Sequence, residues 1–377
     1  MALDYYIRSG QKQLRCGYTT GTCAALAAAG AAEFFLSGKK PETLSLMTPK
    51  GIPVETAPAF LLLKEETAVC GVVKDGGDDA DVTHGLTIEA HVKKSRRPGI
   101  FIDGGEGVGR VTKPGLDQPV GFAAINRVPR RMIEEQVQQV CDKLGYDGGM
   151  EVLICIPGGK EAAQKTFNPM LGVEGGLSIL GTSGIVEPMS EQALVDTIAV
   201  ELRQAAALGA KRLILTPGNY GEDFLREYQI AEDTVPVVKC SNFIGDALDI
   251  ASTHPFTEVL LVGHIGKLVK LAGGVMNTHS RYADCRTELV CAHAAVCGAS
   301  PETCLALLQA ATTDACIEIL DSAQLRVPVL DRLLEAIQQH LEHRVRGKYQ
   351  IGAVLFSNQY GLLGQTQMAK EIMESWK

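Results

Sequence analysis

The chain has 377 residues, which at roughly 100–200 residues per domain favours two domains. Hydrophobic residues make up 46% and charged residues 21%, a globular balance that excludes a disordered or fibrous chain. With 36 Lys and Arg against 44 Asp and Glu, the formal charge of -8 excludes a sequence-wide basic surface for nucleic acid or an anionic membrane.

The first part of the chain predicts two helices and a set of short strands. Residues 21–37 have high helix propensity and a small Ala face, and Gly38 stands at the end as a stop. A second, amphipathic helix is predicted at 129–144. Strands separated by Gly, Pro and Asp are predicted at 43–47, 67–73, 86–92 and 107–112. We expect an α+β domain over residues 1–148 with an antiparallel or mixed sheet, ending at the Gly-rich stretch 145–149.

From residue 149 onward, apolar runs alternate with helical stretches, a pattern typical of an α/β domain with a parallel sheet. Continuous Val, Ile and Leu runs predict strands buried on both faces. These lie at 151–156, 212–216, 235–239, 258–262 and 349–356. Helices are predicted at 191–207 and over most of 300–344. The fold class is therefore α/β, with a Rossmann-like domain over 149–377 whose C-terminal region is helical.

Targeting and metal signals are weak. The first fifteen residues contain no signal-peptide core, and no run of eighteen apolar residues occurs, so we expect a cytoplasmic protein. The 11 Cys include no CxxC pair, which predicts reduced, mostly buried thiols. His264 and His279 have the wrong spacing for a common zinc motif, and no protein metal site is expected.

Glycine-bearing loops follow four of the predicted strands. In a parallel sheet such loops meet at one edge, where bare backbone could receive a phosphate, a carboxylate or a ribose. Tight strand-to-helix turns need glycine in any case, so both interpretations remain open. The dinucleotide fingerprint GxGxxG in its strand–helix context and the GxxxxGK[ST] motif are absent, which removes most support for NAD and ATP sites. The loops are PGGKE (157–161), PGNYGED (217–223), CSNFIGD (240–246) and GHIGK (263–267).

The segment KDGGDDADVTHG (74–85) concentrates four Asp, one Lys and one His directly after a predicted strand. It could bind a hard cation, position a base beside a substrate, or form a solvated acidic turn. It lacks the spacing of an EF-hand. His84 is the best acid–base candidate that the composition offers.

Local clusters of cations could recognise an acidic ligand within this acidic chain. DGGEGVGRVTKPGL (103–116) displays Arg110 and Lys113 on a Gly-rich frame, which suits carboxylate or phosphate recognition as well as a charged surface hairpin. Arg131 lies near the start of a predicted helix, where a cation opposes the helix dipole and indicates an anionic partner, unless Glu134 and Glu135 neutralise it. Lys267 lies three residues before Lys270, on one helix face.

Eight segments, in order, resemble the CbiD family. The resemblance runs from about residue 10 to 365 with little left unmatched. The segments are GYTTGTCAA (17–25), KDGGDDADVTHG (74–85), DGGEGVGRVTKPGL (103–116), NRVPRRMI (126–133), KTFNPMLGVEGGLSILGTSGIVEPMSE (165–191), GNYG (218–221), KCSNFIGD (239–246) and HIGKLVKLAGGVMNTHSR (264–281). Two small departures, Ala80 and Arg127 where the family usually has Pro, affect loop geometry only.

The resemblance implies a methyltransferase that transfers the methyl group of S-adenosylmethionine to C-1 of cobalt-precorrin-5B, giving cobalt-precorrin-6A in anaerobic cobalamin synthesis. The cobalt arrives with the substrate. Proton removal, if a side chain performs it, is assigned to Asp78, Asp81 and His84. The methyl donor is expected on Gly158, Gly159, Gly218, Asn219, Gly221, Asp223, Asp246 and Gly263. The corrinoid carboxylates are expected to face Lys74, Arg110, Lys113, Arg131, Lys267 and His279, in the cleft between the domains.

Other classes of function make different demands on the chain. A non-catalytic corrinoid carrier would bind the macrocycle without S-adenosylmethionine, and an NAD-linked enzyme would need the missing fingerprint. The expected partner is a small-molecule corrinoid, without nucleic acid or membrane. The sequence leaves room for a homo-oligomer and for transient contacts with other enzymes of cobalamin synthesis.

Overall fold

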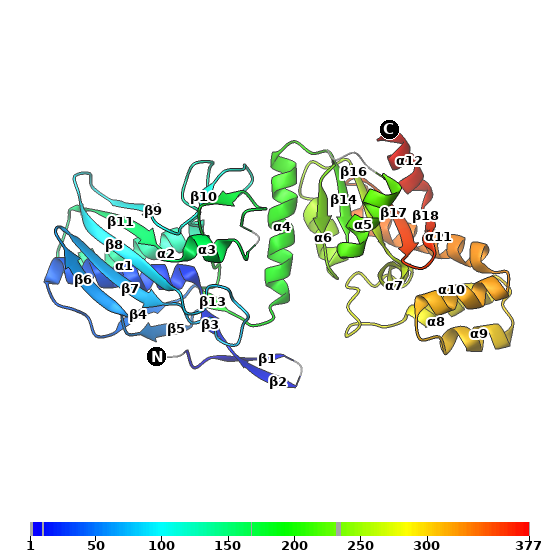
Figure 1. Cartoon of the computed structure of the whole chain (residues 1–377), viewed down its shortest axis with the longest axis horizontal. Coiled ribbons are helices and arrows are strands. Elements are labelled where there is room, and N and C mark those ends of the chain that lie inside the picture. The colour runs from blue at the N-terminus through cyan, green and yellow to red at the C-terminus, as the bar shows by residue number, and fades with distance from the viewer. Residues whose placement is uncertain (1–2, 10, 167, 231–234, 377) are drawn as a thin grey trace. The chain divides into compact units, whose positions relative to one another are not determined.

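The computed structural model describes residues 3–9, 11–166, 168–230 and 235–376 (Figure 1). Contacts divide the chain into two compact units, Met1–Glu191 and Gln192–Lys377. The division lies well after the boundary of 148/149 expected from the Gly-rich stretch. The reason is that strand β11 (Gly149–Cys155) belongs to the sheet of unit 1, antiparallel to β8 (Thr87–Ser95) and parallel to β9 (Ile100–Gly104).

Unit 1 is built from short strands and a few helices. The remaining strands are β1 (Tyr6–Ser9), β2 (Lys12–Arg15), β3 (Gly17–Tyr18), β4 (Leu44–Met47), β5 (Pro53–Thr56), β6 (Phe60–Lys64), β7 (Thr67–Val73), β10 (Arg110–Val111), β12 (Val173–Glu174) and β13 (Ile185–Val186). The helices are α1 (Thr20–Ser37), α2 (Arg127–Lys143) and α3 (Gly159–Ala163).

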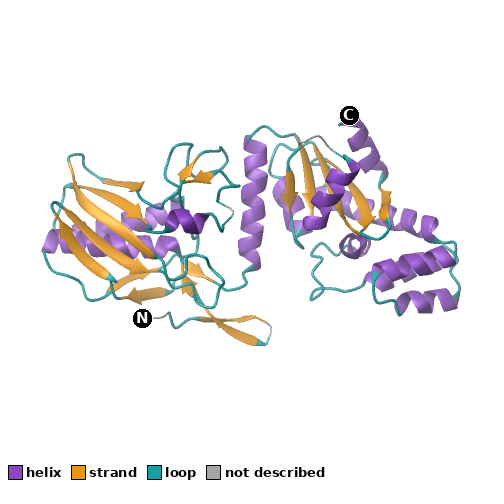
Figure 2. Ribbon diagram, in the orientation of Figure 1, coloured by secondary structure: helices purple, strands orange, loops and turns teal. Residues whose placement is uncertain are grey.

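The main sheet of unit 1 is mixed and has helices on one side. Its strand order is β6-β7-β8-β11-β9, and α1 and α2 pack against one face (Figure 2). Strand β11 was expected to be buried on both faces, but Leu153 is 39% exposed on the opposite face. The mixed sheet predicted for this part is confirmed, while β11 is half-open because its helices cover one face only.

Helix α1 is the centre of the unit 1 core. Its N-cap is Thr19, whose hydroxyl accepts from the Thr22 amide, and Gly38 ends it in the left-handed conformation at φ 70°. Most of its Ala residues are fully buried between α2 and the sheet. Among the described residues this helix is long and apolar enough to cross a membrane, yet 72% of that stretch is buried inside the structure. Core packing therefore accounts for its apolar sequence.

Unit 2 contains a mainly parallel sheet with long helical insertions. Its strands are β14 (Arg212–Thr216), β15 (Val237–Lys239), β16 (Glu258–His264), β17 (Gln350–Ser357) and β18 (Gly361–Gln365). Its helices are α4 (Glu191–Ala207), α5 (Asn219–Tyr228), α6 (Ile244–Ala251), α7 (Ile265–Leu268), the 3-10 helix η1 (Val269–Gly273), α8 (Arg286–Val296), α9 (Pro301–Leu308), α10 (Thr313–Ser322), α11 (Arg326–Val345) and α12 (Gln367–Ser375).

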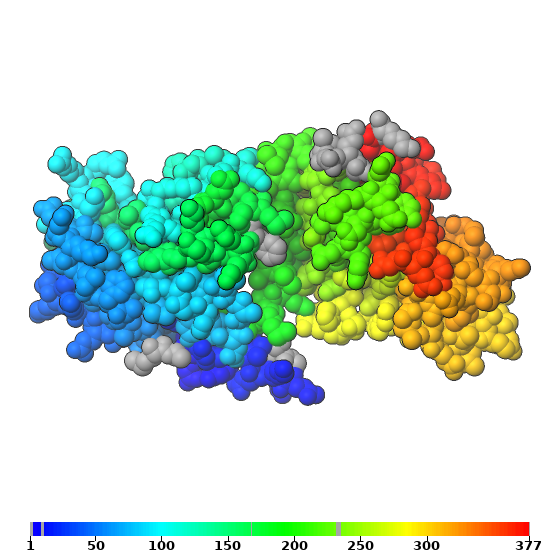
Figure 3. Space-filling view, in the orientation of Figure 1, coloured from blue at the N-terminus to red at the C-terminus, as the bar shows by residue number. Residues whose placement is uncertain are grey.

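The sheet of unit 2 has helices on both faces. Its strand order is β15-β14-β16-β17-β18, in which only the last pairing is antiparallel. Leu213 and Leu261 share one core with α6 and α11, whereas Ile214 and Leu260 share another with α5 and α12. Helices α8, α9 and α10 pack on one another and extend outward from the sheet (Figure 1), and their atoms, coloured yellow to orange, form one end of the unit in Figure 3. The predicted α/β class and the parallel sheet are confirmed.

The strand order identifies the edge at which a ligand would bind. The chain starts at β14, adds β15 on one side and then crosses to β16 on the other. The order reverses between β14 and β16, and ligands of such sheets bind outside the carboxyl ends of the strands at this point. This order differs from the 3-2-1-4-5-6 order of a dinucleotide-binding Rossmann sheet, so the Rossmann-like detail of the prediction is not confirmed.

Candidate functional sites

Three segments far apart in sequence meet around the start of α1. The Thr20 hydroxyl accepts from the Leu180 amide at 3.0 Å, and the Thr22 hydroxyl donates to the Gly184 carbonyl at 2.7 Å. The Tyr18 amide donates to the Asp75 carbonyl at 2.9 Å. The GYTTGT segment therefore ties two loops to one helix end: Tyr18 holds the acidic loop 74–85, and Thr20 and Thr22 hold the loop 178–186.

Glycine is required where these loops touch. Gly77 has a φ of 66°, and a Cβ there would collide with the Arg15 carbonyl. A Cβ at Gly17 would collide with the Asp75 carbonyl in the same contact. The glycines of this cluster serve close backbone packing.

Asp75 and Asp81 of the acidic loop are each paired with a cation of the protein. Arg15 donates from both terminal nitrogens to the Asp75 carboxylate, at 2.6 and 2.8 Å, and this pair holds the pKa of Asp75 well down, at about 2. The Lys74 ammonium, 1% exposed, donates to Asp81 at 2.8 Å. Burial alone would raise the pKa of Asp81, but the Lys74 charge and the Thr83 hydrogen bonds outweigh it and lower that pKa.

The three predicted proton acceptors lie in this one loop but differ in their free atoms. Both oxygens of Asp81 are occupied, one by Lys74 and the other by the amide and hydroxyl of Thr83. Asp78 is exposed and accepts from the Arg15 amide at 2.7 Å through one oxygen. The Nδ1 atom of His84 accepts from the Gly76 amide at 3.0 Å, so the exposed Nε2 carries the proton of the neutral ring. His84 is therefore arranged to donate to a ligand.

A second cluster joins loops 103–116, 157–159 and 168–177. Gly107 has a φ of 72° and packs so closely on the Ile156 carbonyl that no Cβ fits, and Gly159 packs on Gly107 in the same way. A Cβ at Gly158 would meet nothing within 4 Å. Gly158 and Gly159, expected among the strand-end loops of the parallel domain, lie in unit 1 because β11 does. The prediction that Gly158 and Gly159 lie with Gly218 at the edge of one parallel sheet is therefore wrong.

The predicted cations of unit 1 all have protein partners. Arg110 forms a two-pronged pair with Asp103, at 2.7 and 3.0 Å, and donates to the Gly104 carbonyl. Lys113 donates to the Met170 carbonyl at 3.2 Å. Arg131 lies 3.6 Å from Glu135, one turn further along α2. Lys113 and Arg131 are exposed and can exchange these partners for a ligand, whereas Lys74 is buried.

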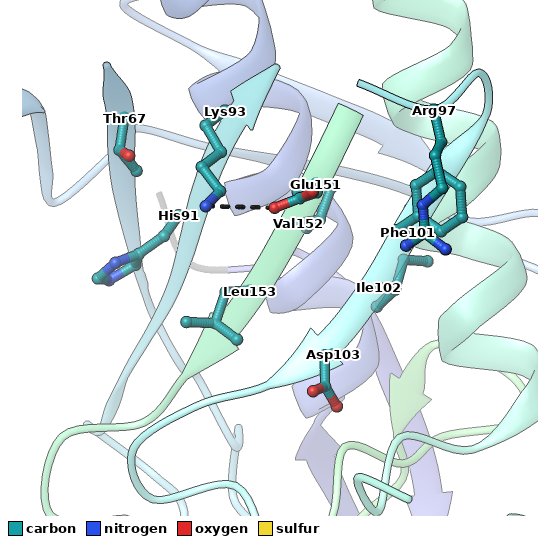
Figure 4. A pocket seen from close by; sticks show the side chains of 10 residues that line it. All are labelled: Thr67, His91, Lys93, Arg97, Phe101, Ile102, Asp103, Glu151, Val152 and Leu153. Atoms are coloured by element: carbon teal, nitrogen blue, oxygen red, sulfur yellow. Dashed lines mark ion pairs between the residues drawn. The ribbon is translucent and has the colours of Figure 1, made fainter. Parts of the chain in front are cut away.

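A shallow hollow lies on the open face of the unit 1 sheet (Figure 4). Lys93 and Glu151 pair at 3.2 Å across its floor, and the Arg97 guanidinium stacks over Phe101 at 4.2 Å from the ring centre. Apart from Asp103, the lining residues lie outside the eight segments that resemble the CbiD family. The lining consists of Thr67, His91, Lys93, Arg97, Phe101, Ile102, Asp103, Glu151, Val152 and Leu153.

In unit 2 the loops at the carboxyl ends of the strands are bonded to one another. Lys267, in α7 after β16, donates to the Pro217 carbonyl after β14 at 2.6 Å. Asn242, after β15, accepts from the Thr278 amide through its carbonyl at 3.0 Å. Three of the segments of the sequence analysis, which carry GNYG, CSNFIGD and HIGKLVKL, thus form one edge.

The glycines of this edge are not equivalent. A Cβ at Gly221 would lie 2.7 Å from Thr216, and one at Gly263 would lie 2.9 Å from Leu268, so packing requires both. A Cβ at Gly218 would meet nothing within 4 Å, although Gly218 and Asn219 stand where the order of strands reverses. Gly218 is therefore the position at which a ligand can approach bare backbone.

The other residues of unit 2 that were predicted to bind a ligand lie on helix surfaces or in turns of the segments that follow the strands. Asp223 is exposed on α5 and lies 3.7 Å from Arg226. Asp246 is exposed in the first turn of α6. The Nδ1 atoms of His264 and His279 accept from the amides of Gly266 and Arg281, which explains both histidines without a metal. In the described parts of the chain, no group of three or more His, Cys, Asp or Glu could hold a metal ion.

Comparison with known proteins assigns the chain to a family. The family model described as CbiD matches residues 7–188, and the model described as CbiD, C-terminal domain, matches 277–367. A protein of Ruminiclostridium cellulolyticum named cobalt-precorrin-5B C(1)-methyltransferase is 45% identical, over 98% of this chain and 98% of its own. The chain belongs to the CbiD family. The family prediction made from the eight segments is confirmed.

Two further relatives support the same assignment. Relatives of the same name from Alkaliphilus metalliredigens and Moorella thermoacetica are 40% and 42% identical, over 100% and 97% of this chain and 98% of each relative. A crystal structure of the cobalamin biosynthesis protein (cbiD) from Archaeoglobus fulgidus is 31% identical and covers 71% of this chain and 83% of its own, with a TM-score of 0.39. The prediction of an enzyme of the methyltransferase class agrees with the names of these relatives.

The sequence-based prediction missed contributors in both units, one beside the acidic loop and two near the strand-end loops of unit 2. Arg15 precedes the first CbiD segment, and nothing local in sequence connects it with Asp75, 60 positions later. Glu201 in α4 is half-buried beside Lys239, and burial raises the pKa of its carboxyl. Lys270 has no role in the sequence-based prediction, because its burial is visible only in the structure.

Proposed function

We propose that this chain transfers a methyl group from S-adenosylmethionine to C-1 of cobalt-precorrin-5B. The observation that carries the proposal is the 45% identity over 98% of both chains to a relative of that name. The electron pair of the ring carbon forms the new carbon–carbon bond as the carbon–sulfur bond breaks, and the sulfur keeps the bonding pair as S-adenosylhomocysteine leaves. The sulfonium is already electrophilic, so the main task of the protein is to align the two reactants.

The methyl donor is assigned to the carboxyl edge of the unit 2 sheet. Gly218 offers open backbone at the reversal of strand order, and Asn219 begins α5 beside it. Asp223 and Asp246 remain our candidates for the ribose hydroxyls. Lys267 was expected to face the corrinoid, but its contact with Pro217 in this loop favours the donor. We assign it to the carboxylate of the methionine part.

The corrinoid carboxylates are assigned to cations that a ligand can reach. Lys113 and Arg131 are exposed and Arg110 is half-buried on the second cluster, all three in unit 1. Lys74 is 1% exposed and held by Asp81, so we give it a structural role. For any proton that leaves the ring, Asp78 is the candidate acceptor, while His84 presents an N–H that can bind a carboxylate arm.

The remaining expectations follow from the same reaction. The cobalt belongs to the corrinoid substrate and arrives with it. We propose that the protein works in the cytoplasm and that any contacts with other enzymes of cobalamin synthesis are transient.

The test is a complete reaction without oxygen. Purified protein is given cobalt-precorrin-5B and S-adenosylmethionine carrying a ¹³C-methyl group, and the products are followed by mass spectrometry and carbon NMR. One labelled methyl at C-1 and an equal amount of S-adenosylhomocysteine are expected. Unchanged macrocycle mass would refute the proposal. Tight corrinoid binding without any heat of binding for S-adenosylmethionine would indicate a carrier.

A further inference from the structure

Lys270 is a buried cation that faces a single loop. Its side chain is 3% exposed, and its ammonium donates to the carbonyl oxygens of Thr278 at 3.0 Å and Ala283 at 2.8 Å. The Asp284 carboxylate lies 3.7 Å away. An ammonium taken out of water is costly unless it is fully hydrogen-bonded, and here every acceptor belongs to residues 278–284.

The same loop is fixed from its other side by the strand-end loop after β15. The Thr278 amide donates to the Asn242 carbonyl at 3.0 Å, and the Met276 carbonyl accepts from the Gly245 amide at 3.0 Å. Phe243 and Asn277 form an isolated β-bridge between the two segments. Thr278 is thus held through its amide by one strand-end loop and through its carbonyl by Lys270.

The two lysines of the segment after β16 reach different loops. Lys267 bonds to Pro217 after β14, while Lys270 bonds to the loop 275–284. His279 and Arg281, which that loop presents, are exposed. Their local turn is closed by the His279 ring, which accepts from the Arg281 amide at 3.2 Å. The segment therefore spans the carboxyl edge of the sheet, with one cation at each end.

We propose that Lys270 is a positioning residue for the methyl-donor site. It touches no ligand itself. It fixes the loop 275–284 against the loop after β15, so that this loop forms a rigid side of the site at the strand edge that holds Gly218 and Lys267. This inference rests on the proposed function, because it needs the donor at this edge. Without the charge, the Thr278 and Ala283 carbonyls lose their partner and the loop separates from Asn242 more often.

The test uses Lys270→Met in the full-length protein, with Lys270→Arg as the conservative variant. Tyr349→Phe is the matched control, since it removes a buried hydrogen bond, from the Tyr349 hydroxyl to the Leu248 carbonyl at 2.9 Å, just before β17 and therefore at the amino end of the strands. Hydrogen exchange of residues 275–284 and the Kd of S-adenosylmethionine by calorimetry are measured for all three and for the wild type.

Lys270→Met is expected to speed hydrogen exchange in the loop 275–284 and to raise the Kd of S-adenosylmethionine about tenfold, because a displaced loop no longer positions the donor correctly. Lys270→Arg should recover part of both, and Tyr349→Phe should change neither. The inference is overturned if the wild type binds the donor and Lys270→Met binds it equally well, or if its loop exchange is unchanged. Absence of binding by the wild type itself would instead overturn the proposed donor site, and this inference with it.

Discussion

Lys74 and Asp81 form a 2.8 Å ion pair in which the lysine is 1% exposed and the aspartate 22% exposed. The pair closes the acidic loop from inside, since the second Asp81 oxygen accepts from the amide and hydroxyl of Thr83. A carboxylate whose pKa is lowered and whose oxygens are both engaged is a poor general base. Asp81 therefore stabilises the loop, while the side chains of Asp78 and His84 are exposed on it.

Replacing Lys74 by Met should cost unit 1 about 2–4 kcal/mol, because Asp81 keeps its burial and loses its cation. Hydrogen exchange of α1 is the suitable measurement, since the single Trp376 lies in unit 2 and does not report on unit 1. Lys93→Met, which breaks the exposed pair with Glu151, is the control and should cost less than about 1 kcal/mol. Equal effects of the two substitutions would contradict a structural role for Lys74.

Gly218 and Gly221 provide a test of why the strand-end loop is rich in glycine. Gly221→Ala should lower the stability of unit 2 by about 1–2 kcal/mol, because the new methyl meets Thr216 at 2.7 Å. Gly218→Ala should leave stability within about 0.5 kcal/mol, since the Cβ enters open space and the extended backbone suits alanine. Chemical denaturation followed by Trp376 fluorescence measures both.

The same two variants separate packing from ligand binding. Gly218→Ala is expected to weaken S-adenosylmethionine binding about tenfold by filling the approach to the backbone, without loss of stability. Calorimetry on the folded variants checks this. An unchanged Kd for Gly218→Ala would mean that the loop is glycine-rich only because its turn requires it.

Much of the fold follows from local sequence patterns. Helix α4 covers exactly the residues that its apolar periodicity predicts, and α1, β7 and β14 begin and end within a residue or two of expectation. Strand β11 was placed in the wrong unit, because its apolar run is equally suited to a mixed sheet and its partners β8 and β9 precede the Gly-rich stretch. Strand pairing across tens of residues leaves no mark in a single sequence.

The candidate sites show the same limit. The segments that carry Asp75, Gly218 and Lys267 were recognised from their composition, since loops that combine Gly with charge are uncommon outside sites and tight turns. Their partners were not, because Arg15 and Thr278 reach them only through the fold. Burial also decided roles that composition left open, as for Lys74 and Lys270.

The Lys267 ammonium should bind the carboxylate of the methyl donor. Its ammonium is half-buried, and burial lowers its pKa, so affinity for a carboxylate should fall with rising pH earlier than for an exposed lysine. The wild type should bind decarboxylated S-adenosylmethionine about tenfold more weakly than S-adenosylmethionine, which is about 1.4 kcal/mol. Lys267→Met should bind both compounds equally.

Calorimetry measures the Kd of S-adenosylmethionine and of its decarboxylated form for the wild type and for Lys267→Met. Lys267→Arg is the control that keeps the charge and should retain most of the preference for the carboxylate. If Lys267→Met still prefers the carboxylated donor tenfold, another group holds that carboxylate and Lys267 returns to the corrinoid or to the Pro217 contact alone.

Arg15 and Asp75 make a pH-dependent contribution to the stability of unit 1. The pKa of Asp75 is about 2 in the folded chain, against an unfolded value near 3.8. A lowered carboxyl pKa stabilises the fold fully above the unfolded value, and the contribution disappears as the pH falls from about 4 through about 2. Both side chains are partly exposed, so we expect about 1–2 kcal/mol at neutral pH.

Asp75→Asn should therefore destabilise unit 1 at pH 6, and its difference from the wild type should shrink as the pH falls toward about 2, in exchange measurements of α1 across this range. Glu151→Gln, which removes an exposed pair in the same unit, is the control and should show a small difference. A gap between wild type and Asp75→Asn that stays constant down to pH 2 would show that the aspartate acts through its shape and backbone contacts. The charge of Arg15 would then contribute nothing to the acidic loop.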